Sequence, residues 1–123
     1  MTAASPIAQW LGFSVFERDG ARLYRLAFNE AHIGNPAIRA LHGGVIAAFL
    51  ELAMQIELSA LEKPAAATVN VSVDYLSSSR AEDMTATVRL IRTGRRIAFL
   101  EAEGRQAEGT RLVALARACL KLA

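Results

Sequence analysis

The sequence predicts an α+β domain in which one antiparallel sheet wraps around a single long, buried helix. Three observations predict this fold: one uninterrupted apolar helical segment, several segments that alternate apolar and polar residues, and a face of small residues on the last two strands. The chain has 123 residues, of which 53% are hydrophobic. This is enough apolar material for a single core, so we expect a single domain over residues 1–123.

The predicted helix extends from Val45 to Leu61 and must end before Pro64. Good helix formers dominate it, and its apolar residues lie nearly all the way round, which is typical of a buried helix. Glu51 stands out in this segment, because a buried carboxylate is costly unless it is paired, hydrogen-bonded or used in chemistry.

The turn before this helix contains His42, Gly43 and Gly44. Backbone N–H groups at a helix start have no partner within the helix, and the helix dipole makes that end positive. Such a start stabilises negative charge, and it lies about two turns from Glu51. The pair therefore indicates a catalytic site.

A hairpin is predicted at Asp19-Gly20, a dipeptide favoured in type I′ turns, between strands 13–18 and 22–28. A short amphipathic turn precedes it at residues 6–11, and a loop is predicted from 29 to 40. Four more strands are predicted at Thr68–Leu76, Met84–Arg92, Arg96–Gly104 and Arg111–Leu122. The composition of the last segment also favours a helix, but its apolar residues alternate, so we prefer a strand.

Two faces of these strands are informative. In 68–76, alternation places the valines and Tyr75 on one face and Thr68, with the other polar residues, on the opposite face. The last two strands share a face of small residues, which would let a sheet curl closely around a helix. The small residues are Ala98, Ala102, Gly104, Ala114, Ala116 and Ala118.

Composition argues against several classes of protein. A net charge of +2 and an aromatic content of 7% give little basis for nucleic-acid binding. Cys119 is the only cysteine, which excludes an internal disulfide and makes a cytoplasmic location the expectation. The two histidines match no zinc spacing, so no metal site is expected, and His32 is interpreted as a surface loop residue. Three polar side chains within the apolar segment, Glu51, Gln55 and Glu57, argue against a membrane span.

The order of elements resembles the hotdog-fold acyl-CoA thioesterases of the PaaI-like type. The residues that carry the resemblance are Leu41-His42-Gly43-Gly44 at a helix start, an acid nine residues after the histidine, and the strand Thr-Val-Asn-Val-Ser-Val-Asp-Tyr-Leu after the helix. The resemblance covers nearly the whole chain. It implies hydrolysis of an acyl- or aryl-CoA thioester, with no prosthetic group or other cofactor.

The resemblance also implies roles for individual residues. The backbone N–H of Gly43 or Gly44 would polarise the thioester carbonyl, and Glu51 would act as general base or as nucleophile. Most PaaI-like members carry Asp at this position, whereas Glu is typical of a neighbouring branch that acts on hydroxybenzoyl-CoA. Gln55 and Thr68 would position the acid or the water.

Further residues are expected around the substrate. Asn35 resembles the family's loop Asn, although it lies seven residues before His42 where the usual spacing is six. His42 is placed beside the substrate and is expected to cap the helix or fix the loop. Arg80, Arg95 and Arg96 lie beside strand connections, where they would bind the CoA phosphates.

The strand Thr68–Leu76 resembles the edge through which hotdog subunits pair, so we expect a homodimer or a dimer of dimers, a homotetramer. Family sites lie between subunits, with Glu51 of one chain facing Gly43 of the other. Two alternatives remain: a non-catalytic acyl-CoA-binding protein, and a hotdog dehydratase or hydratase, whose His-containing motif is absent here. The acyl group is left open.

Overall fold

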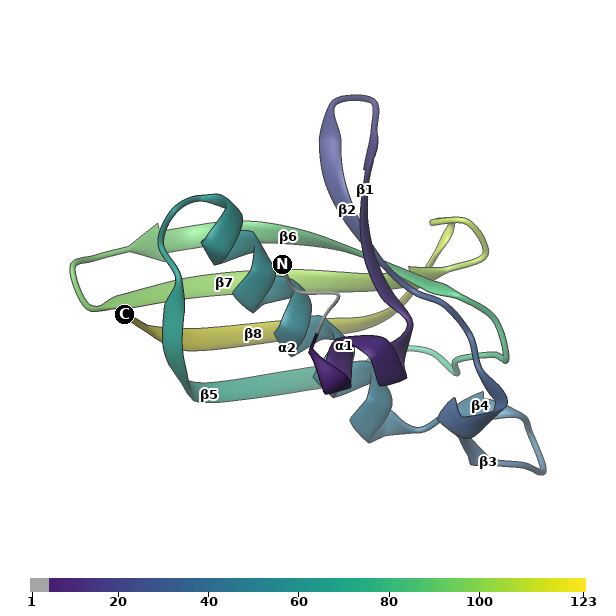
Figure 1. The fold of residues 1–123 in the computed structure, drawn as a ribbon. Coiled ribbons are helices and arrows are strands. Elements are labelled where there is room, and N and C mark those ends of the chain that lie inside the picture. Colours follow the sequence, from purple (N-terminus) through teal and green to yellow (C-terminus); the bar gives the residue numbers. More distant parts are fainter. Residues whose placement is uncertain (1–4) are drawn as a thin grey trace.

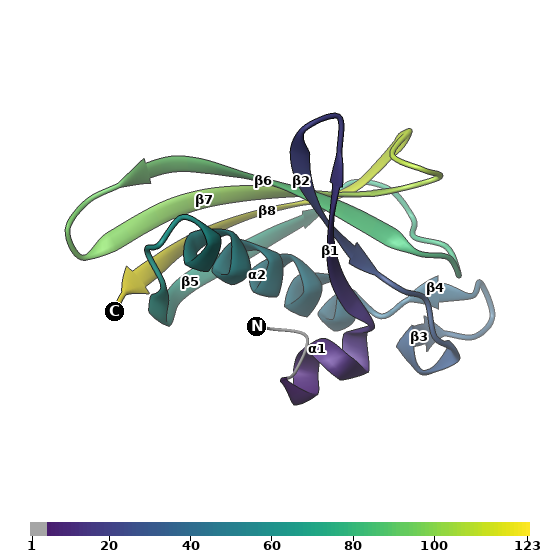
Figure 2. The ribbon, with the colours of Figure 1, turned by 45° about the horizontal axis from the view of Figure 1, so that its top comes forward.

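The computed structural model describes residues 5–123. A six-stranded antiparallel sheet, in the order β1-β2-β6-β7-β8-β5, curves around helix α2 (Gly43–Ala60), which packs on one of its faces (Figure 1). The short helix α1 (Pro6–Leu11) lies against α2, and strands β3 and β4 lie beyond the start of α2 (Figure 2). This confirms the predicted α+β architecture of one sheet around one long helix.

The strands follow from local sequence signals. Asp19 and Gly20 both have positive φ, 53° and 78°, as a type I′ turn requires. The segment whose composition also favoured a helix is a strand of 12 residues, which confirms the preferred reading. The six strands of the sheet are β1 (Phe13–Arg18), β2 (Ala21–Leu26), β5 (Ala65–Tyr75), β6 (Met84–Thr93), β7 (Ile97–Gln106) and β8 (Arg111–Leu122).

The small residues of β7 and β8 lie under α2, as predicted, and all of them are buried. Gly104 shows why the residues under the helix must be small. A Cβ there would lie 3.0 Å from Sδ of Met84 and 3.3 Å from Cδ2 of Leu50, so a side chain would push the helix away. The helix contributes to the core Val45, Ile46, Phe49, Leu50, Ala53, Met54 and Leu58.

One stripe of α2 is less buried than predicted. Ala48, Glu51, Leu52 and Gln55 are only half-buried, so the expectation of a helix buried all round is wrong along this stripe. The helix is long and apolar enough to span a membrane, but core helices meet the same criteria, and its other face packs on the sheet.

A β-bulge in β5 changes the direction of a candidate site residue. Thr68 pairs with Leu120, and Asn70 pairs with the adjacent Cys119, so Val69 is an extra residue that has no partner in β8. Thr68 therefore faces α2, whereas Val69 is 59% exposed. The predicted face of Thr68 is wrong, because the bulge inverts the alternation at this point.

The predicted loop 29–40 is also more ordered than expected. His32, predicted to be a surface residue, is fully buried. Its Nδ1 accepts the backbone N–H of Asn29, and its Nε2 lies 3.0 Å from the carbonyl oxygen of Trp10, so the ring fastens this segment to α1. The segment contains the 3₁₀-helix η2 (Glu30–His32) and the short strands β3 (Ile33–Asn35) and β4 (Ala40–Leu41).

Candidate active site

Three of the predicted site residues form one hydrogen-bonded group between α2 and β5. The Thr68 hydroxyl donates to Oε2 of Glu51 at 2.6 Å. Gln55, one helical turn after Glu51, donates from Nε2 to the same hydroxyl at 3.3 Å. Because the hydroxyl has only one proton, its direction is set: it donates to the carboxylate and accepts from the amide. The bulge in β5 makes this arrangement possible.

Glu51 retains acceptor capacity. Within residues 5–123 its second oxygen, Oε1, accepts no hydrogen bond. Glu51 and Gln55 line a hollow of about 200 Å³ together with Ile7, Ala48 and Leu52. A water molecule or a substrate carbonyl carbon in this hollow would lie close to the Glu51 carboxylate.

The start of α2 is held by two side chains. His42 is the N-cap, and its Nδ1 accepts the backbone N–H of Gly44 at 2.8 Å. Tyr75 donates from its hydroxyl to the carbonyl oxygen of Gly43 at 2.7 Å. Both polar ends of the peptide unit that joins Gly43 to Gly44 are therefore occupied. This places His42 in the predicted capping role.

The free donor at this helix start is the N–H of Gly43. It belongs to the preceding peptide unit, and it has no hydrogen-bond partner in the described part of the chain. Gly43 also has no space for a large side chain, since a Cβ would lie 3.3 Å from the Tyr75 hydroxyl. The structure thus assigns the free backbone N–H to Gly43, whereas the sequence offered Gly43 and Gly44 equally.

Tyr75 was missed as a site residue, because the sequence indicated only its place on an apolar strand face. The available signal was an aromatic hydroxyl at the end of β5, the strand that follows α2. Its contact with Gly43 bridges residues 32 positions apart, so no local pattern could reveal it.

The two halves of the candidate site lie apart within one chain. Glu51 follows Gly43 by eight residues on the same helix, which corresponds to a rise of about 12 Å along the axis. A rise of that size along the backbone is long compared with the span of one carbonyl group and its hydrogen bond.

A second hollow lies beside the helix start. It has a volume of about 380 Å³ and is formed by α1, the segment around β3 and the first turns of α2. Its lining is mostly apolar, and its polar side-chain groups are the His42 imidazole and the Trp10 indole N–H. The lining residues are Ile7, Trp10, Leu11, Ala31, Ile33, His42, Gly44, Val45 and Ala48.

Asn35 lies apart from this group. It is exposed in β3, and its Oδ1 accepts the backbone N–H of Ala37 at 3.0 Å, which stabilises the turn before β4. It lines neither of the two hollows. The structure therefore does not bring Asn35 to Glu51 within one chain.

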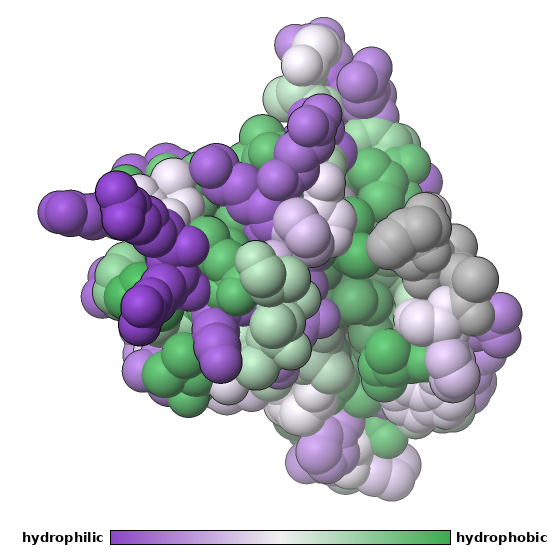
Figure 3. All heavy atoms as spheres, turned by 60° about the vertical axis from the view of Figure 1, so that its left-hand side comes forward, coloured by the Kyte–Doolittle hydropathy of each residue, from purple (hydrophilic) through white to green (hydrophobic). Residues whose placement is uncertain are grey.

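One of the three predicted arginines, Arg80, lies apart from the other two. Arg80 is in the connection after β5, where its backbone binds the side chain of Gln106. Arg95 and Arg96 are exposed in the turn between β6 and β7, at the opposite end of the sheet. Figure 3 faces that end, and strongly hydrophilic side chains project from it beside apolar surface.

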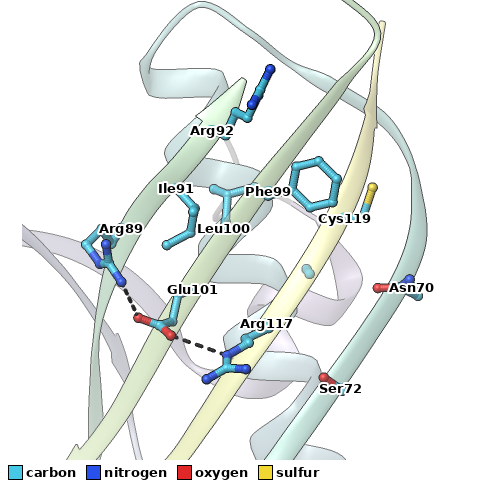
Figure 4. Close-up of a pocket in the computed structure, with 11 residues that line it drawn as sticks. Asn70, Ser72, Arg89, Ile91, Arg92, Phe99, Leu100, Glu101, Arg117 and Cys119 are labelled. Atoms are coloured by element: carbon cyan, nitrogen blue, oxygen red, sulfur yellow. Dashed lines mark hydrogen bonds and ion pairs between the residues drawn. The ribbon is translucent and has the colours of Figure 1, made fainter. Parts of the chain in front are cut away.

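A larger hollow, of about 520 Å³, lies on the face of the sheet opposite α2 (Figure 4). Glu101 accepts hydrogen bonds there from Arg89 at 2.9 Å and from Arg117 at 3.4 Å. The bond from Arg89 is the main cause that holds the pKa of Glu101 below its ordinary value. None of the candidate catalytic residues lines this hollow, so we do not assign it to the chemistry of Glu51.

A single long helix wrapped by a curved antiparallel sheet, with an acid on the helix and a free N–H at its start, defines a hotdog protein of the thioesterase class. Residues 39–113 match the thioesterase superfamily, so the chain belongs to that superfamily. A solved protein of the same superfamily is 30% identical to it, with a TM-score of 0.88 over 99% of this chain and 92% of that chain. No curated protein sequence matches the chain.

Other solved structures are similar to this PaaI-like hotdog fold. A phenylacetic acid degradation-related protein from Ralstonia eutropha JMP134, assigned as a thioesterase, is 26% identical, with a TM-score of 0.82 over 97% of this chain and 92% of that chain. A Bacillus halodurans protein solved with CoA has a TM-score of 0.86 at 20% identity, over 100% of this chain and 82% of that chain. At that identity the second likeness concerns the fold alone.

Proposed function

We propose that the protein hydrolyses an acyl- or aryl-CoA thioester to the free acid and CoA. The observation that carries this proposal is the Glu51 carboxylate, held by Thr68 beside a hollow and left with one free oxygen. Membership of the thioesterase superfamily supports it, and a structural neighbour was solved with CoA.

In the general-base route, Glu51 removes a proton from water, and the resulting hydroxide attacks the thioester carbonyl carbon. The carbonyl electron pair moves to oxygen, and the N–H of Gly43 and the positive end of the helix stabilise that oxyanion. When the intermediate collapses, the carbon–sulfur bond breaks, and the protonated Glu51 returns its proton to the CoA thiolate. The hydrogen bond from Thr68 keeps the carboxylate oriented throughout.

In the alternative route, Glu51 attacks the carbonyl carbon itself, expels CoA thiolate and forms a mixed anhydride that water then hydrolyses. The two routes differ in one observable. Rapid quenching followed by mass spectrometry would find the acyl mass on the peptide that contains Glu51 only if Glu51 is the nucleophile.

We propose further that each site is shared between two copies of the chain. The separation of about 12 Å between Gly43 and Glu51 along α2 supports this, because a second copy could place its own Glu51 next to Gly43. Strand β5 is at the edge of the sheet, and a long unpaired edge favours antiparallel pairing with the same strand of a partner. A homodimer built in this way could associate further as a dimer of dimers.

The arginines fit the same arrangement. A two-fold axis at β5 would bring the Arg95 and Arg96 end of one chain towards the Arg80 end of the other, where together they could bind the phosphates of CoA. Because these side chains are exposed, this attraction should weaken with salt, so KM should rise with ionic strength while kcat changes little.

Release of free thiol from a panel of acyl-CoAs tests the proposal. The wild type should release thiol well above background, and Glu51→Gln should lower kcat by about 10²–10⁴-fold. Glu62→Gln, at an exposed acid just past the same helix, is the matched control and should retain activity. Activity retained in Glu51→Gln would remove that residue from the mechanism.

Absence of thiol release with every substrate would contradict the proposal. Calorimetric binding of acyl-CoA without turnover would then favour the non-catalytic binding protein. Loss of enoyl absorbance without thiol release would favour a hydratase.

A further inference from the structure

We propose that the hollow between α1 and the start of α2 holds the acyl group of the substrate, that it selects uncharged acyl groups without hydroxyl substituents, and that Ile7 and Trp10 limit their size. This inference rests on the proposed thioesterase function and names its substrate class. It also assigns a role to α1, which the catalytic scheme does not use.

Position is the first argument. The hollow is lined by His42 and Gly44, the residues on either side of Gly43, whose N–H is free. A thioester carbonyl that accepts from Gly43 would therefore place its substituents close to this hollow. One substituent is the long polar CoA arm, which needs a path to solvent, so the acyl group is the one that fits an apolar recess.

The chemistry of the lining is the second argument. The hollow is mostly apolar on α1, on the β3 side and on α2, and its polar side-chain groups are the His42 imidazole and the Trp10 indole N–H. Nδ1 of His42 is already used by Gly44. A carboxylate or hydroxyl placed among these side chains would exchange its hydrogen bonds to water for at most two donors, the imidazole Nε2–H and the indole N–H.

The wall formed by α1 is firmly placed. The ring of Trp10 meets the ring of His32 edge-on, with centroids 4.9 Å apart, and Nε2 of the same histidine lies 3.0 Å from the Trp10 carbonyl oxygen. His32 is fully buried, which anchors α1 to the segment before β3. A wall held in this way has a fixed position, which is needed if it is to discriminate substrates by size.

Ile7 and Trp10 are also only half covered by the rest of the described chain. They are 47% and 50% exposed, although both are large apolar residues on the rim of the same hollow. An apolar ligand in the hollow would cover them and would gain free energy from the buried area. Ile7 lines the smaller hollow beside Glu51 as well, so it lies between the recess and the acid.

Pairs of substrates that differ in one group test the selectivity. Values of kcat/KM should be about 10–100-fold higher for benzoyl-CoA than for 4-hydroxybenzoyl-CoA, and for butanoyl-CoA than for succinyl-CoA. Equal or better turnover of the hydroxylated or charged member would overturn the inference and would leave the thioesterase function intact. Failure of all substrates would contradict the proposed function itself.

Variants of the wall test the role of α1. Trp10→Ala should shift the best chain length upwards in a series of straight-chain acyl-CoAs, and Ile7→Phe should shift it downwards. Phe99→Ala, at a residue 42% exposed on the opposite face of the sheet, is the control and should leave the profile unchanged.

The readout is the ratio of kcat/KM between long and short substrates, because loss of folded protein lowers all rates equally and leaves a ratio unchanged. Trp10→Leu is the second variant if Trp10→Ala does not fold. An unchanged profile in Trp10→Leu and Ile7→Phe would overturn the role of α1.

Discussion

The hydroxyl of Tyr75 donates a hydrogen bond of 2.7 Å to the carbonyl oxygen of Gly43, at the first turn of the helix that carries Glu51. The N–H at the other end of the same peptide unit donates to His42. The two side chains together fix the peptide that follows the free N–H, and so fix the direction of that N–H. Preorganised donors of this kind require no reorientation when an oxyanion forms.

Tyr75→Phe should therefore lower kcat with little change in KM. The loss of one hydrogen bond corresponds to about 0.5–1.5 kcal/mol, or roughly a threefold to tenfold decrease in rate. Steady-state kinetics with one good acyl-CoA measures both parameters. The melting temperature should change little, because Tyr75 is half-exposed. An increase in KM with kcat unchanged would show that Tyr75 contacts substrate instead.

Thr68 offers a sharper comparison, since two substitutions separate its hydroxyl from its shape. Thr68→Val keeps the volume and removes the donor to Glu51, so kcat should fall. Thr68→Ser keeps the donor and should retain most of the activity. Equal losses in both variants would mean that packing of the methyl group, not the hydrogen bond, is the important feature.

Mixing two inactive variants tests whether sites are shared between chains. Gly43→Val removes the space beside Tyr75, and Glu51→Gln removes the acid. If Gly43 of one chain works with Glu51 of another, a mixed dimer contains one intact site, and unfolding and refolding the two variants together should restore part of the activity. Each variant refolded alone is the control. A mixture that stays inactive, although native mass spectrometry shows mixed dimers, would place both residues of a site in one chain.

A buried tyrosine beside a half-buried ion pair, outside the site, predicts how stability depends on pH. Tyr24 is fully buried, and its hydroxyl donates to Glu57, which also accepts two hydrogen bonds from Arg22. Burial, followed by the hydrogen bond to Glu57, raises the pKa of Tyr24 above its ordinary value of 10.0. The folded state therefore keeps the phenol proton at a pH at which the unfolded chain loses it.

Stability from this group is fully present below the unfolded pKa and is lost as pH rises above it. Tyr24→Phe should lower the free energy of unfolding by about 1.5–3 kcal/mol near neutral pH, because a buried hydrogen bond to a charged group is removed. Urea unfolding at about pH 8 and about pH 11 should show a smaller difference between wild type and variant at the higher pH. A difference independent of pH would exclude a raised pKa as its cause.

The sequence alone determined the long helix, the strands of the main sheet and the acid on the helix. Helix α2, its capped start and Glu51 follow from helix-forming residues, Pro64 and apolar flanks, and the first hairpin follows from Asp19-Gly20. These signals are local, because the period of apolar residues and the φ preference of a turn residue depend on neighbours in the chain.

Only the tertiary structure decided which groups meet. The face of Thr68 depends on one extra residue in the pairing of β5 with β8, and alternation within β5 cannot reveal that. The burial of His32 depends on the position of Trp10, 22 residues earlier. The hydrogen bond from Tyr75 to Gly43 joins β5 to the helix start across 32 residues. Each of these results from contacts between distant segments, which form only when the sheet has closed around the helix.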